Sequence, residues 1–156
     1  MVPPYSFYFS GDSYSETGFN PWGTLPSIGN PLGNPAYPGR TAVGGENWVD
    51  LLTTADNNSL ILTYNLAWGG ATIDSRLVKS GQGVSLTNEV NAFLKKFANK
   101  PASTPWKPQN TLFSFWIGIN DIGYSYFLDG DRNAYVPPPH TPSYASKYSS
   151  HRIQVF

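Results

Sequence analysis

The chain has 156 residues, with ten basic and ten acidic side chains and a formal net charge of zero, a length that suits one compact domain. A net charge of zero implies no basic patch, and no apolar run approaches the ~20 residues that span a bilayer, so neither nucleic acid nor a membrane is an expected partner. Cysteine is absent, which excludes disulfides and thiolate chemistry, and we expect no metal and no cofactor.

The first predicted element is a strand over residues 5–9, which runs into Gly11-Asp12-Ser13. A serine at the carboxyl end of a strand lies where open α/β sheets bind their ligands, and its hydroxyl is exposed there. Gly-Asp-Ser alone is a weak signal, because these residues are also common in ordinary turns.

Residues 20–46 are rich in proline and glycine and predict a long ordered loop. A short helix capped by Asn47 is predicted next. Its apolar face at helical spacing comprises Trp48, Leu51, Leu52 and Ala55. Residues 60–65 predict a second strand, and their nearly continuous apolar character is typical of a parallel strand covered on both faces.

A second helix is predicted after Ser85 as its cap. Its apolar face comprises Leu86, Val90, Phe93, Leu94 and Phe97. A third strand is predicted over residues 111–117. Strands therefore alternate with helices, which predicts a three-layer α/β fold with a parallel sheet. Six strand side chains are expected to be largely buried: Phe7, Phe9, Ile61, Leu62, Phe113 and Phe115.

Each predicted strand ends in a polar turn that contains glycine. Because the carboxyl ends of parallel strands share one edge, Ser13, Gly70 and Asn120 are expected to meet in one cleft. These residue types suit acyl transfer, in which serine attacks an ester carbonyl. The N–H groups of Ser13 and Gly70 and the side-chain amide of Asn120 can then stabilise the negative oxygen that forms.

Each residue also has a purely structural interpretation. Asp12 can simply cap its turn, and Gly70 can serve only to adopt a positive φ. Asn120 and Asp121 can be the cap residues of a helix. Their occurrence together at three successive strand ends favours a site, with Asp12 and Asp121 as supporting residues.

The three turns, in this order, resemble the first three sequence blocks of the SGNH/GDSL hydrolases. The flanking segments are similar to fungal acetylesterases of the carbohydrate-esterase type: residues 12–20, 29–35, 47–53 and 115–123. This resemblance implies a flavodoxin-like, three-layer parallel sheet, with Ser13 as nucleophile and Gly70 and Asn120 as oxyanion donors. It also implies an extracellular enzyme that hydrolyses acetyl esters of carbohydrates, including oligosaccharides, or other small esters, without a cofactor.

The carboxyl-terminal part departs from that family, which completes its triad with an Asp-x-x-His segment. The histidines here are His140 and His151, and Pro137 and Tyr148 stand three residues before them. The catalytic His and Asp are therefore not identifiable. We expect residues 1–135 to be the amino-terminal part of such a domain, hence an incomplete fold, and residues 136–156 to be an unrelated disordered tail.

Two other interpretations remain open. One is a non-catalytic sugar-binding module, because aromatic residues make up 15% of the chain and can stack on sugars; an all-β structure would favour it. The other is a fragment that does not fold, because loss of later strands would expose a sheet edge. Residues 1–4 show no signal-peptide pattern, and the sequence leaves the oligomeric state open.

Overall fold

The structure is a computed structural model that describes residues 4–135. Its centre is one parallel sheet, in the order β2-β1-β3. The strands are β1 (Tyr5–Gly11), β2 (Ile61–Asn65) and β3 (Thr111–Trp116). Tyr8 of β1 pairs with Tyr64 on one side and with Phe113 on the other. The parallel arrangement is confirmed, and the three strands lie where the sequence placed them.

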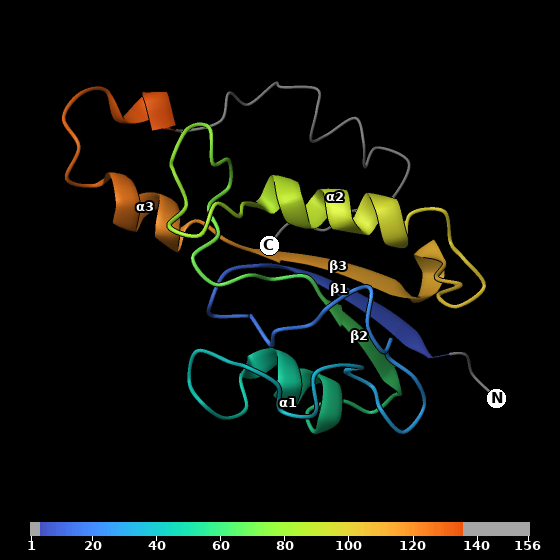
Figure 1. Cartoon of the computed structure of the whole chain (residues 1–156). Helices are drawn as coiled ribbons and strands as arrows, with labels where there is room; N and C mark the ends of the chain where they lie inside the picture. Colours follow the sequence, from blue (N-terminus) through green and yellow to red (C-terminus); the bar gives the residue numbers. More distant parts are fainter. Residues whose placement is uncertain (1–3, 136–156) are drawn as a thin grey trace.

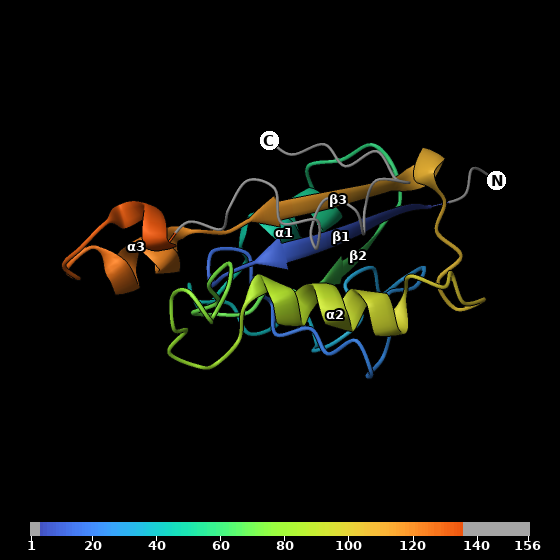
Figure 2. The same ribbon diagram turned by 90° about the horizontal axis from the view of Figure 1, so that it is seen from above.

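Two helices cover opposite faces of the sheet (Figures 1 and 2). Helix α1 (Trp48–Thr54) contacts β2, and helix α2 (Leu86–Lys96) contacts β1. These three layers confirm the predicted fold class. Helix α3 (Ile119–Ser125) lies beyond the carboxyl ends of the strands, and the 3-10 turns η1 (Pro108–Asn110) and η2 (Arg132–Tyr135) complete the elements.

The hydrophobic core is an aromatic cluster between the sheet and α2. Tyr8 stacks on Tyr64 and Phe113, with ring centroids 4.7 and 5.2 Å apart. Phe93 and Phe97 of the α2 region contact Tyr8 at 5.1 and 5.5 Å. Packing thus accounts for much of the aromatic content, and the mixed α/β structure counts against the all-β sugar-binding module.

The expected burial of the strands is only partly correct. Phe9 and Ile61 are buried, at 2% and 5% exposure. Four other side chains are only half-buried: Phe7, Leu62, Phe113 and Phe115. Leu62, Phe113 and Phe115 lie on β2 or β3, the edge strands of the described sheet, which have a neighbouring strand on one side only. Phe7 lies on the central strand β1, whereas α1 packs chiefly against β2.

Helix α1 begins at its predicted cap. The Asn47 side chain accepts the N–H groups of Val49 and Asp50 at 2.9 and 3.3 Å, and the Asp50 carboxylate accepts the Asn47 N–H at 2.9 Å. This reciprocal pair satisfies donors that the first turn would otherwise leave unpaired.

The buried face of α1 is not the predicted one. Val49, Asp50 and Thr53 are buried, and Thr53 Oγ1 lies 2.7 Å from Thr63 Oγ1 of β2. The apolar residues expected on the covered face are instead exposed or half-exposed: Trp48, Leu51, Leu52 and Ala55. A hydroxyl pair across the contact thus turns the helix away from the orientation that its apolar spacing indicated.

Helix α2 follows the sequence more closely. Ser85 is its N-cap residue, and Val90, Phe93 and Phe97 are buried as expected, while Leu86 and Leu94 are half-buried. The proline-rich stretch of residues 20–46 is an ordered loop. The tail expected over residues 136–156, with His140 and His151, lies outside the described residues.

Candidate active site

Ser13 lies half-buried in the turn directly after β1. Asp12 is fully buried, and its Oδ1 accepts the Tyr14 N–H at 3.0 Å. Its backbone carbonyl accepts the N–H groups of Ser15 and Glu16, both at 3.0 Å. Asp12 therefore caps the turn that presents Ser13. Its Oδ2 has no hydrogen-bond partner among the described residues, and burial raises the pKa of this carboxyl.

The end of β1 and the Ser13 turn are joined to the end of β2 and the segment after it by three hydrogen bonds. Asn65, the last residue of β2, donates from Nδ2 to the carbonyl of Ser15 at 2.6 Å and to Thr17 Oγ1 at 3.1 Å. The Trp68 N–H donates to the carbonyl of Gly11 at 3.2 Å. The first two rim segments are therefore in direct contact.

Gly70 lies in the segment between β2 and α2, with a φ of +75°. A Cβ at this position would meet the Tyr124 hydroxyl at 3.6 Å, an ordinary contact. The left-handed backbone, and not lack of space, therefore favours glycine here. The positive φ explains glycine at position 70 whether or not its N–H takes part in the chemistry.

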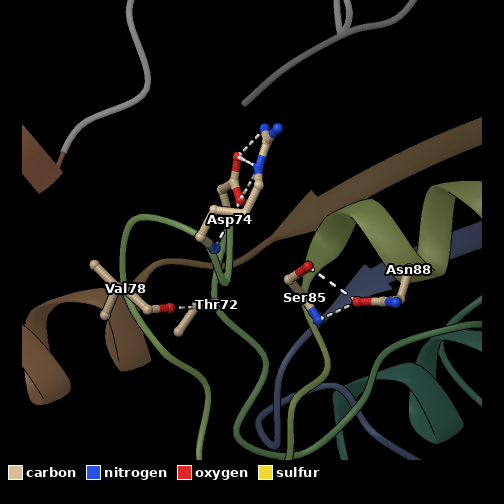
Figure 3. Close-up of polar contacts among 6 residues, drawn as sticks. Thr72, Asp74, Val78, Ser85 and Asn88 are labelled. Atoms are coloured by element: carbon tan, nitrogen blue, oxygen red, sulfur yellow. Dashed lines mark hydrogen bonds and ion pairs between the residues drawn. The ribbon is translucent and has the colours of Figure 1, made fainter.

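Polar contacts fold the segment between Thr72 and Asn88 into a defined shape (Figure 3). Thr72 is fully buried, and its hydroxyl donates to the carbonyl of Val78 at 3.0 Å. Arg76 pairs with Asp74 and lowers the pKa of that carboxyl. At the far end, the Ser85 N–H and hydroxyl donate to Asn88 Oδ1 at 2.9 and 3.0 Å, where α2 begins (Figure 3).

Asn120 and Asp121 reach the same segment from the first turn of α3. Asn120 Nδ2 donates to the carbonyl of Ala71 at 2.9 Å. The two carboxylate oxygens of Asp121 accept the Ile73 N–H at 3.0 and 3.1 Å, and burial raises the Asp121 pKa. Gly118 is the N-cap residue of α3, so the interpretation of Asn120 and Asp121 as cap residues is wrong.

These contacts bring the three turns to one edge of the sheet. The segment that carries Gly70 is bonded on one side to the end of β1 and on the other side to Asn120 and Asp121. Close packing supports this, because a Cβ on Gly69 would lie 2.6 Å from a carboxylate oxygen of Glu16.

Sequence reasoning missed Glu89, a buried carboxyl beneath this edge. Glu89 is 3% exposed, and its Oε2 accepts the Gly11 N–H at 2.9 Å. Burial raises its pKa to about 9, although the N–H groups of Gly11 and Trp68 act in the opposite direction. The signal was present, because position 89 stands three residues after Leu86 and four before Phe93, on the apolar face of α2.

An aromatic cavity also adjoins the Ser13 turn. Its volume is about 210 Å³, and it is lined by Tyr14, Trp48 and Trp116. The Trp48 indole N–H donates to Ser15 Oγ at 3.2 Å, and the Trp48 and Trp116 ring centroids are 6.4 Å apart. The Trp48 ring is therefore held in place beside the turn that carries Ser13.

Residues 4–135 include no histidine, and within that range no group of three His, Cys, Asp or Glu side chains is arranged to hold a metal ion. No helix in the described part of the chain has the length and apolar character needed to cross a membrane.

Comparison with known proteins identifies the family. Residues 7–152 match the GDSL-like lipase/acylhydrolase family, to which this chain belongs. This match extends past the domain boundary expected at residue 135, and it confirms the resemblance found in the turns.

Two fungal relatives are named acetylesterases. The chain is 50% identical to the acetylesterase of Thermothelomyces thermophilus over 115 residues, which are 72% of this chain and 38% of the relative. It is 28% identical to the acetylesterase of Hypocrea jecorina over 126 residues, 76% of this chain and 35% of that relative. The chain thus spans little more than a third of the length of these curated relatives.

Proposed function

We propose that this chain carries the nucleophile and the oxyanion donors of a serine esterase. Ser13 is the nucleophile, and the donors are the N–H groups of Ser13 and Gly70 with the side-chain amide of Asn120. The observation that supports this most is the Asn120–Ala71 hydrogen bond of 2.9 Å, which holds the amide beside Gly70. Asp12 and Asp121 support the site by fixing the turn and the segment to which they are bonded.

In this reaction Ser13 Oγ attacks the ester carbonyl carbon, and its proton passes to a base. The tetrahedral intermediate places its negative oxygen among the donors, where each donor is typically worth a few kcal/mol. The alcohol leaves with a proton, and water then clears the acyl group from Ser13.

The base is the part that the described residues do not supply. We infer that an Asp-x-x-His segment from additional polypeptide completes the triad, and that the 156-residue chain alone is nearly inactive. Enzymes that lose a triad member keep a residual acceleration on the order of 10³–10⁴ over water, which comes from the oxyanion hole and binding. We propose that the part similar to the fungal acetylesterases ends near residue 135, although the family match itself extends to residue 152.

The substrate that we propose is an acetyl ester of a sugar, an oligosaccharide or another small alcohol, because both relatives are named acetylesterases. Tyr14, Trp48 and Trp116 suit the sugar part, since aromatic rings stack on the apolar faces of sugars. We also propose an extracellular location, on the resemblance to the fungal acetylesterases.

The test joins this chain to the carboxyl-terminal part of the Thermothelomyces thermophilus acetylesterase that it does not match. This fused enzyme should hydrolyse an aryl acetate, the bare chain should show at most residual turnover, and Ser13→Ala should abolish turnover in the fused enzyme.

Other results would overturn parts of the proposal. A fused enzyme whose turnover survives Ser13→Ala contradicts the choice of nucleophile. Robust turnover by the bare chain that is lost on His140→Ala or His151→Ala shows that residues 136–156 supply the base. Tight binding of acetylated oligosaccharides by a folded fused chain without any turnover favours the sugar-binding module.

A further inference from the structure

The carboxyl of Glu89 is buried at the point where the elements of the site meet, and the proposed reaction does not use it. Glu89 lies on α2, is 3% exposed and bonds the N–H of Gly11 at 2.9 Å through Oε2. Its Oε1 has no hydrogen-bond partner among the described residues. Burying a carboxyl costs free energy unless it is hydrogen-bonded, so the bond to Gly11 compensates part of that cost.

Glu89 holds the last residue of β1, which is in contact with the segment after β2 and with the end of β3. The carbonyl of Gly11 accepts the Trp68 N–H at 3.2 Å. A Cβ on Gly11 would lie 2.3 Å from the carbonyl oxygen of Trp116, the last residue of β3. No side chain of Gly11 can therefore anchor this position, and its peptide groups must do so.

We propose that Glu89 is a positioning residue for the reaction of Ser13, acting through the hydrogen bond that it accepts from Gly11. The bond fixes the end of β1 two residues before Ser13, and with it the contact to the segment that carries Gly70. This inference rests on the proposed role of Ser13 as the nucleophile.

The electrostatics of the site fit a neutral carboxyl in this position. The pKa of Glu89 is raised to about 9, chiefly by burial, and the negative charge of Asp12, in the turn after β1, contributes to this rise. Asp12 is the ionisable side chain whose charge contributes to this shift. A neutral Glu89 accepts the Gly11 N–H without placing a second negative charge beside Asp12.

Three variants separate positioning from packing. Glu89→Gln keeps the shape and an acceptor for Gly11, Glu89→Leu removes the acceptor, and Val90→Ala is the matched control. Val90 is the neighbouring buried residue of α2, at 6% exposure. Its truncation disturbs the same helix without removing the bond to Gly11.

The first measurement is NMR of the 156-residue chain, which does not depend on activity. The Gly11 amide proton should move upfield in Glu89→Leu and stay in place in Glu89→Gln and Val90→Ala. Carbon-13 labelling of the three glutamate carboxyls should show the Glu89 signal, identified by its loss in Glu89→Gln, still protonated at pH 7. The proposal is overturned if the Gly11 amide proton does not move in Glu89→Leu. If Glu89→Leu does not fold, a displaced Gly11 amide proton in Glu89→Gln overturns it.

The second measurement is the kinetics of the fused enzyme. Glu89→Leu should lower kcat about ten- to a hundredfold, with KM changed by less than about twofold. Glu89→Gln should restore most of kcat, and Val90→Ala should keep it. Equal losses in Val90→Ala and Glu89→Leu indicate packing alone and overturn the proposal. If no fused enzyme shows Ser13-dependent turnover, the proposed function fails, while the Gly11 amide still decides the role of Glu89.

Discussion

Asn120 donates a hydrogen bond from its side-chain amide to the carbonyl oxygen of Ala71, over 2.9 Å. The bond joins the start of α3 to the residue after Gly70, so the side-chain amide of Asn120 is held next to the backbone that carries the Gly70 N–H. An amide nitrogen carries two hydrogens, and the bond to Ala71 uses one of them. The second hydrogen remains for a substrate oxygen, which is what an oxyanion donor needs.

Replacing Asn120 should therefore affect the chemical step. In the fused enzyme, Asn120→Ala should lower kcat about 10²–10³-fold, the usual cost of one oxyanion donor, with little change in KM. Asn91→Ala is a suitable control, because Asn91 is an exposed asparagine of α2 outside its capping turn. The role assigned to Asn120 is wrong if kcat stays within about threefold of the parent value.

Gly70 and Gly83 allow strain to be separated from chemistry. Their φ values are +75° and +71°, and a Cβ on Gly83 would meet nothing within 4 Å. Alanine at either position should cost roughly 1–2 kcal/mol of unfolding free energy, because the left-handed backbone disfavours a Cβ. Only Gly70→Ala should also lower kcat in the fused enzyme, since relief of strain there moves an N–H of the oxyanion hole. Equal kcat values in the two variants would show that Gly70 is not part of the site.

Glu89 should make the fold less stable as the pH rises. Its pKa is raised from 4.5 to about 9 by burial, so between these values the folded chain binds more protons than the unfolded chain. The free energy of unfolding then falls with increasing pH, by at most about 1.4 kcal/mol per pH unit for one group. The raised pKa values of Asp12 and Asp121 act in the same direction.

Urea unfolding of the chain between about pH 5 and 8 measures this slope. Glu89→Gln should flatten it. The contribution of Asp74 to the pH dependence has the opposite sign. Its pKa is lowered, so its stabilisation is lost as the pH falls below 3.8, which is outside the tested range. A free energy of unfolding that rises over this range in the parent chain would contradict the burial of a neutral Glu89.

The bare chain should associate with itself through the end of β3. Within residues 4–135 β3 pairs only with β1. Three apolar side chains at its end and in the residues that follow, Trp116, Ile122 and Phe127, are 61%, 63% and 64% exposed. An open edge beside an apolar surface favours association. Light scattering after gel filtration should show a molar mass that increases with concentration.

Two tryptophans of equal exposure test the location of this surface. Trp116→Lys should reduce the association, whereas Trp22→Lys, at a 62% exposed position in the loop of residues 20–46, should leave it unchanged. Association that responds equally to both substitutions, or a molar mass that stays at 17.1 kDa at every concentration, would contradict the prediction.

The sequence by itself determined the local features of this protein. The strands, the caps Asn47 and Ser85 and the turns with Ser13, Gly70 and Asn120 all follow from short stretches of chain, because strand formation, capping and turn formation depend on neighbouring residues. The order of these stretches was sufficient to identify the family and the parallel α/β fold.

The tertiary structure alone decided which side chains are covered and which groups bond across elements. The apolar spacing of α1 pointed to Trp48 and Leu51, but Val49 and Thr53 are the buried residues, and Thr53 bonds Thr63 of β2. Phe113 was expected to be buried, yet its strand is an edge of the described sheet. Glu89 meets Gly11 across 78 positions of sequence, and no local pattern encodes such a contact, because it arises only when α2 packs against β1.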